Sequence, residues 1–124
     1  MMKEKIFTLK MNGYCCSQII MAIGLELLGK ENDALIEAMA GLCDGAKCGS
    51  ICGVVSAANC LLYLADSRQA ESGRVQEYLD WFEASFGALD CAQLLDGDPA
   101  VKIEKCPVFV ENTLTKLVEL LELD

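Results

Sequence analysis

The sequence predicts an all-α protein, a compact bundle of about five to six helices in a single domain. Apolar residues recur at helical spacing in two long stretches, Val75, Tyr78, Leu79, Phe82 and Phe86 in one and Val110, Leu114, Leu117, Val118 and Leu121 in the other. Patterns of alternating apolar and polar residues, which would indicate strands, are scarce. The length of 124 residues suits one domain, which we expect to span residues 1–124.

Turn and capping residues divide the first half of the chain into helices. Asn12-Gly13 predicts a turn, after which residues 16–28 form a helix that stops near Gly29. Asn32 or Asp33 can cap a helix that runs to about residue 42. A glycine-rich loop follows, and the next helix begins at Ile51-Cys52.

The second half contains three further helix boundaries. Gly87 can end the helix that begins near residue 75, and Asp90 precedes a short helix that contains Cys91. Cys106-Pro107 predicts the start of the last helix, because proline is favoured at the first helical position.

Charge and hydropathy exclude several classes of function. The net charge of −9 argues against nucleic acid as a partner, since binding phosphates requires clustered lysine and arginine. The longest apolar run, 51–65, has 15 residues, fewer than the about 20 of a membrane span. We find no targeting segment and expect a cytoplasmic protein. The apolar fraction of 53% would suit a subunit interface, which predicts a homo-oligomer.

Eight cysteines and no histidine define the chemistry open to this chain. Without histidine there is no Ser-His or Cys-His nucleophilic pair. In the cytoplasm thiols are kept reduced, so cysteines there act more often as metal ligands or redox groups than as permanent disulfides. The sequence has no C-x-x-C, so it indicates neither a thioredoxin-type site nor a zinc ribbon, and no C-x-x-C-H, so covalent haem is excluded.

Four cysteines share one local setting, since each lies in the first turn of an expected helix: Cys16, Cys52, Cys91 and Cys106. A helix N-terminus offers free N–H groups and a partial charge of roughly +0.5, which favour thiolate over thiol. Cysteine also packs at helix ends as a small apolar residue, and that alternative applies to each of the four separately. Their wide separation means that any shared site is assembled by folding.

The other four cysteines carry weaker signals. Cys43 and Cys48 lie in the glycine-rich loop, where the flexible backbone would let their sulfurs approach a metal or cluster. Cys60 is expected in the core. Cys15 could be a spare thiol or a second ligand, and the sequence leaves its role open.

The sulfur-bearing segments resemble the C_GCAxxG_C_C family of redox-active proteins, which share four cysteines and a CGAxxG motif. The resemblance spans about residues 13–120 and is carried by four segments, Gly13-Tyr14-Cys15-Cys16-Ser17-Gln18, Cys52-Gly53-Val54-Val55-Ser56-Ala57, Cys91-Ala92-Gln93-Leu94-Leu95-Asp96-Gly97 and Lys105-Cys106-Pro107. It places Cys16 rather than Cys15 on the first family cysteine. It also implies that Gly53 lets the backbone approach a bound cofactor, and that the protein comes from an anaerobe.

Two hypotheses of function follow, with a third as the baseline. In the first, Cys16, Cys52, Cys91 and Cys106 converge and carry out thiol–disulfide or electron-transfer chemistry with a redox partner protein. In the second, the same four thiolates, with Cys43 or Cys48, hold zinc or an iron–sulfur cluster. The baseline is a helical scaffold whose cysteines are structural. The substrate, the electron partner and the enzyme class stay open.

Overall fold

The computed structural model describes residues 2–122, so that Met1, Leu123 and Asp124 of the expected domain lie outside the described residues. The longer helices are α1 (Met2–Met11), α2 (Cys16–Leu27), α3 (Asp33–Ala38), α4 (Gly53–Ala65), α6 (Val75–Phe86) and α8 (Lys102–Leu120). Shorter turns of helix connect them: η1 (Met39–Leu42), η2 (Gly45–Gly49), α5 (Ser67–Gln69), η3 (Ala70–Arg74), α7 (Cys91–Leu94) and η4 (Pro99–Val101). Within residues 2–122 the only strand-like pairing is one antiparallel bridge, between Ile51 and Asp90. The all-α prediction is confirmed.

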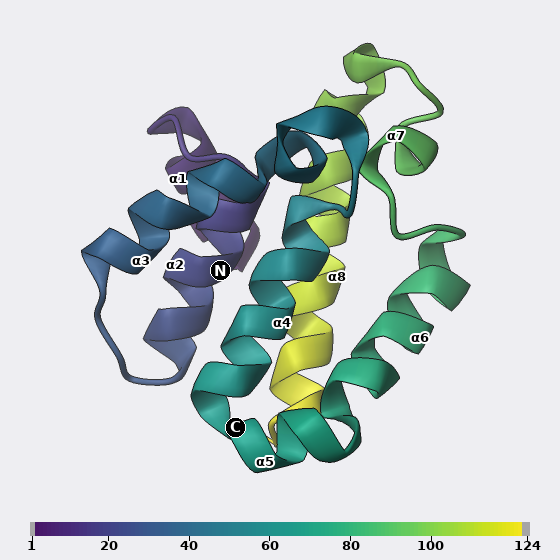
Figure 1. Cartoon of the computed structure of the whole chain (residues 1–124). Coiled ribbons are helices and arrows are strands. Elements are labelled where there is room, and N and C mark those ends of the chain that lie inside the picture. Colours follow the sequence, from purple (N-terminus) through teal and green to yellow (C-terminus); the bar gives the residue numbers. More distant parts are fainter. Residues whose placement is uncertain (1, 123–124) are drawn as a thin grey trace.

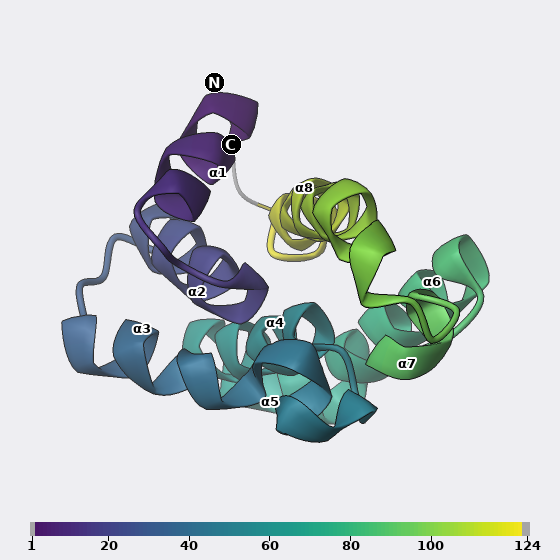
Figure 2. The same cartoon turned by 90° about the horizontal axis from the view of Figure 1, so that it is seen from above.

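Helices α2, α4 and α8 pack against one another and form the centre of the bundle. Figure 1 shows α4 and α8 side by side through the middle, with α6 on one flank and α2 and α3 on the other. Figure 2 shows α1 lying over α2 and beside α8. None of the helices within residues 2–122 is both long and apolar enough to cross a membrane.

The central contact between α2 and α4 depends on a glycine. A side chain at Gly24 would overlap the side chain of Leu61, whose Cγ lies 2.9 Å from the position of a Cβ. The absence of that side chain lets the two helices approach closely, and both bury apolar faces there, with Ile20 and Leu62 fully enclosed. Close packing of this kind contributes dispersion and burial energy together.

Helix α6 is held to α8 by aromatic packing and one buried hydrogen bond. Phe82 and Phe86 contact Phe109 with ring centroids 5.8 and 4.8 Å away. The hydroxyls of Tyr78 and Thr113 lie 3.0 Å apart in the core, which satisfies both polar groups. The predicted apolar faces of both helices are therefore the faces that pack.

Most predicted boundaries agree with the structure. Helix α2 ends before Gly29, which adopts φ +70°, and Asn32 caps α3 by accepting a hydrogen bond from the Leu35 amide at 3.0 Å. Helix α6 ends at Gly87, whose φ is +90°. Helix α4 begins two residues later than expected, at Gly53, with Cys52 as its cap.

The prediction for the start of the last helix is wrong. Helix α8 begins at Lys102, and Pro107 lies inside it. The proline that marks the start is Pro99, which opens η4 directly ahead of α8, while the Asp98 carboxylate accepts a hydrogen bond from the Ala100 amide at 2.9 Å. Pro107 removes the bond to the Ile103 carbonyl, and since Ile103 is 73% exposed, water can replace it.

Candidate redox site

The predicted site residues are brought to one end of the bundle. Cys16 is the first residue of α2, Cys52 caps α4, Cys91 is the first residue of α7, and Cys106 lies in the second turn of α8. The N-terminal ends of α2, α4 and α8 meet at the end of the molecule where α7 lies (Figure 1). Charge on Cys106 affects the ionisation of the other three cysteines. We call these four residues the thiol cluster.

A short backbone bridge positions the Cys52 and Cys91 members of the thiol cluster. The Cys52 amide donates to the Leu89 carbonyl at 2.8 Å, and the Cys91 amide donates to the Ser50 carbonyl at 2.7 Å. These two bonds join the segment before α4 to the segment before α7. Residues that are far apart in the sequence are thereby fixed as neighbours.

Cys16 and Cys106 are the members of the thiol cluster whose side chains most strongly influence each other's ionisation. Interaction with the Cys106 side chain holds the pKa of Cys16 above its ordinary value, and burial adds to the effect. Interaction with the Cys16 side chain lowers the pKa of Cys106, and the nearby ammonium of Lys102 lowers it further. One member of the pair is thus kept as a thiol and the other is favoured as a thiolate.

The expectation that all four helix-start cysteines favour the thiolate is wrong. At Cys52 the amides of Val54 and Val55 do lower the pKa, as predicted for a helix N-terminus, but burial outweighs them and raises it to about 11. Burial also raises the pKa of Cys91. Cys106 alone has a lowered pKa, and its cause is its partners rather than the end of its helix. Burial depends on the tertiary structure, and a cysteine's position at the start of a helix does not predict it.

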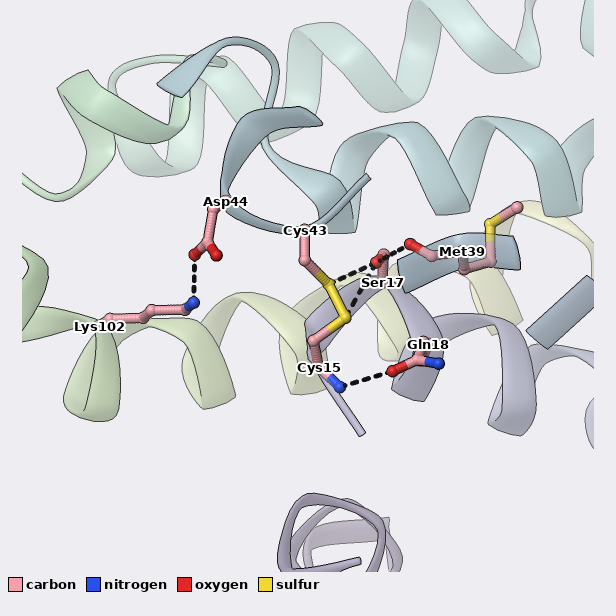
Figure 3. The surroundings of a disulfide bond; sticks show 7 residues. All are labelled: Cys15, Ser17, Gln18, Met39, Cys43, Asp44 and Lys102. Carbon is pink, nitrogen blue, oxygen red and sulfur yellow. Dashed lines mark hydrogen bonds and ion pairs between the residues drawn. A yellow bond between two sulfur atoms is a disulfide. The ribbon is translucent and has the colours of Figure 1, made fainter. Parts of the chain in front are cut away.

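Lysine and aspartate side chains surround the pair. Lys102, the first residue of α8, forms an ion pair with Asp44 (Figure 3), and its ammonium also lowers the pKa of both Cys16 and Cys91. Lys10, at the end of α1, is close enough to lower the pKa of Cys106. A lysine in the first turn of a helix is electrostatically unfavourable. The Asp44 carboxylate and the Cys106 thiolate offset that cost at Lys102.

A cavity of about 290 Å³ opens directly onto the pair. Its walls come from α1, α2 and α8, with Cys16 and Cys106 among the lining residues. Cys106 is only 9% exposed and is one of the residues that line the cavity.

The family model for "Putative redox-active protein (C_GCAxxG_C_C)" matches residues 14–120, which include all four cysteines of the thiol cluster. The chain belongs to this family. No curated protein and no solved structure matches the chain.

The structure gives the glycine of the family motif a packing role. A Cβ at Gly53 would lie 2.6 Å from the Leu42 carbonyl oxygen and 3.2 Å from the Ser17 Cβ. The start of α4 therefore lies directly against η1 and the start of α2. This contact sets the position of Cys52, whereas the expectation that Gly53 approaches a cofactor stays a prediction.

This member of the family carries a disulfide that the sequence analysis missed. Cys15 is bonded to Cys43, with their Cα atoms 6.3 Å apart (Figure 3). The buried Ser17 hydroxyl donates to the Met39 carbonyl at 2.6 Å and lies 2.8 Å from the Cys43 sulfur. In this state Cys43 is not available as a ligand. The nearest signal in the sequence is that neither cysteine belongs to the four that the family shares.

The two remaining cysteines lie at the surface. Cys48 is exposed in η2, where its thiol donates to the Gly45 carbonyl at 3.5 Å. Cys60 is exposed on α4, so its expected place in the core is wrong. Residue 60 shares the exposed face of α4 with Tyr63 and Leu64, three and four positions further on, and both of those apolar side chains are exposed as well.

The metal site of the second hypothesis stays a prediction. Within residues 2–122, no group of three or more cysteine, aspartate or glutamate side chains has an arrangement that could hold a metal ion. Within the thiol cluster the strongest mutual influence on ionisation is between Cys16 and Cys106.

Proposed function

We propose that this protein is a thiol–disulfide redox protein in which Cys106 is the attacking thiolate and Cys16 the resolving thiol. The observation that carries the proposal is that Cys16 and Cys106 line the same cavity and shift each other's pKa in opposite directions. Thiolate is the nucleophilic form of cysteine, and a second thiol within reach completes the exchange. Family membership supports redox chemistry without naming the residues.

The proposed reaction has two exchange steps. The Cys106 thiolate attacks one sulfur of a disulfide in the oxidant, the oxidant's S–S bond breaks, and one thiolate leaves. Cys16 then loses its proton and attacks the Cys106 sulfur of the mixed disulfide, which releases the second thiolate. Two protein thiols have become one disulfide, and the oxidant's disulfide has become two thiols, so two electrons are transferred.

Cys52 and Cys91 take part in the proposal as neutral neighbours. Their raised pKa values keep both protonated near neutral pH, so they add no negative charge beside the Cys106 thiolate. Thiolates crowded together would repel one another and raise the pKa of each. A redox partner protein that reduces the Cys16–Cys106 disulfide again would close the cycle.

The test begins with reduced protein purified without oxygen. Glutathione disulfide is added, the thiols are counted, and peptide mapping with fragmentation assigns each new bond. We expect reversible loss of two thiols beyond the two that form the Cys15–Cys43 bond, and a Cys16–Cys106 disulfide. In Cys16→Ser the reaction should stop at a mixed disulfide between Cys106 and one glutathione. In Cys106→Ser neither this mixed disulfide nor the Cys16–Cys106 disulfide should form.

Cys60→Ser is the matched control, because it removes an exposed thiol that plays no part in the proposed steps. It should react like the unmodified chain. If Cys106→Ser loses as many thiols as the unmodified chain, or if Cys16→Ser and Cys106→Ser lose only thermal stability, the proposal is wrong and the scaffold hypothesis holds. Metal analysis of the same sample gives a separate result: one zinc per chain, or iron with sulfide, would support the metal hypothesis instead.

A further inference from the structure

The cavity above the thiol pair differs in charge from the rest of the chain. The whole protein carries a net charge of −9, yet two of its ten cationic side chains, Lys10 and Lys102, line this cavity. No aspartate or glutamate occurs among the described residues that line it. The cavity is therefore a locally cationic site in an acidic protein.

The two lysines are not equivalent. Lys102 forms an ion pair with Asp44 outside the cavity, so much of its charge is already balanced. Among the described residues, Lys10 forms no ion pair within 4 Å. Its ammonium nevertheless lies near enough to Cys106 to affect that thiol. An anion bound in the cavity would pair with the Lys10 ammonium close to the Cys106 sulfur.

The remaining walls limit the size and polarity of what can bind. Ile6, Ile19 and Val110 contribute apolar surface, and Tyr14 contributes a ring with a hydroxyl. The volume of about 290 Å³ lies at the lower end of small-molecule pockets, which span about 300–1,000 Å³. A mostly apolar pocket with a few placed polar groups is the usual form of such sites.

We infer that the substrate is a low-molecular-weight disulfide with a short apolar chain and a carboxylate, which binds between Lys10 and the Cys16–Cys106 pair. This inference rests on the proposed function. The carboxylate would lie near the Lys10 ammonium, the carbon chain against Ile19 and Val110, and the disulfide at Cys106. The chemistry is the two-step exchange above, in which the bound disulfide accepts two electrons and leaves as two thiols.

Three disulfides that share a central CH2-CH2-S-S-CH2-CH2 unit and differ in the charge of their end groups test the inference. They are 3,3′-dithiodipropionate with two negative charges, bis(2-hydroxyethyl) disulfide with none, and cystamine with two positive charges. Each is used to oxidise the reduced protein, and each rate is divided by the rate at which the same disulfide oxidises free 2-mercaptoethanol. This division removes the intrinsic reactivity of each probe. We expect the normalised rates to fall in the order anionic, neutral, cationic.

Lys10→Gln isolates the role of the cation. We expect it to reduce the ratio of the anionic to the neutral rate by about threefold, the effect of one partly exposed ion pair. Lys3→Gln removes the same charge from the same helix and should leave that ratio unchanged, because Lys3 does not line the cavity. The ratio is the relevant readout, since a change in Cys106 reactivity alone would slow all three probes equally. Added salt should lower the ratio in the unmodified protein.

The outcomes separate the two proposals. If all three normalised rates are equal, or if Lys10→Gln and Lys3→Gln have the same ratio, the substrate inference is overturned while thiol exchange stands. If none of the probes forms a Cys16–Cys106 disulfide but glutathione disulfide does, the substrate inference also fails. If no disulfide oxidises the pair at all, the proposed function fails with it.

Discussion

Lys102, at the first residue of α8, pairs with Asp44, which lies 58 residues earlier in the chain and adopts a left-handed backbone with φ +57°. The pair connects the loop before η2 to the helix that carries Cys106. Lys102 favours the Cys106 thiolate, whereas Asp44 opposes it. The charge state of the reactive sulfur therefore depends on the balance between these two side chains.

Asp44→Asn should make Cys106 more reactive. The substitution removes a negative charge that raises the pKa of Cys106 and releases Lys102 from its partner, so both effects lower that pKa. We expect alkylation of Cys106 by iodoacetamide at neutral pH to be about twofold to fivefold faster. Peptide mass spectrometry after timed quenching measures this rate across a pH series.

Lys102→Met should have the opposite effect and slow the same alkylation, because it removes the cation that favours the thiolate. Lys105→Met is the control, since Lys105 pairs with Asp96 and not with the thiol cluster. Equal rates in Lys102→Met and Lys105→Met would show that Lys102 does not control Cys106.

Stability should decrease between pH 9 and 11, and Cys52 should account for part of that decrease. Its pKa is about 11 in the folded protein and 9.0 ordinarily, so the folded state holds the proton more tightly than the unfolded state. The contribution of Cys52 to stability is complete below the pKa that it has in the unfolded state. This contribution is lost as the pH rises through the pKa of the folded state. Two pKa units correspond to about 2.7 kcal/mol.

Urea unfolding of the unmodified chain and of Cys52→Ala at several pH values measures this contribution. The variant should be less stable overall and should lose less stability from pH 9 to 11. Cys106 has a lowered pKa and contributes with the opposite sign, but its contribution is already complete above pH 9. Parallel pH profiles in the two proteins would contradict the prediction.

Reduction of the Cys15–Cys43 disulfide should destabilise the protein by about 3 kcal/mol. The bond closes a loop with a sequence separation of 28, and cross-linking such a loop restricts the unfolded chain. Thermal unfolding with and without a phosphine reductant measures the effect. The double variant Cys15→Ser, Cys43→Ala should be insensitive to the reductant. If the melting temperature of the unmodified chain does not change on reduction, the bond does not stabilise the fold.

Gly53→Ala should destabilise the protein by about 1–3 kcal/mol, as overpacking does. The added methyl would lie 2.6 Å from the Leu42 carbonyl oxygen, and the backbone cannot easily yield there. Gly41→Ala is the matched control, because a Cβ at that position meets nothing within 4 Å. Chemical denaturation compares the two. Equal stability losses would mean that the contact at Gly53 is not the cause.

The helices could be predicted because their signals are local. Gly87 ends α6 and Asn32 caps α3, and each does so through a hydrogen bond to a residue no more than four positions away. The error at the start of α8 arose from two prolines, Pro99 and Pro107, that carry the same local preference. Packing against α2 and α4 stabilises α8 as a helix that continues through Pro107.

The candidate site could be predicted in part. The set of four cysteines was found from position and from family resemblance, and the structure places them at one end of the bundle. Which of them ionises was not predictable, because burial at Cys52 and a thiol partner at Cys106 are contacts between distant segments. The Cys15–Cys43 bond was missed for the same reason.

The sequence by itself determined that this chain is helical, where most of its helices begin and end, and which cysteines belong to the family. These properties follow from periodicity, capping and motifs, which act over a few residues. Only the tertiary structure decided that Cys16 faces Cys106, that Lys10 and Lys102 line their cavity, and that Cys52 keeps its proton. Thiol reactivity depends on distance, burial and nearby charge, and these are set when segments far apart in the chain are packed together.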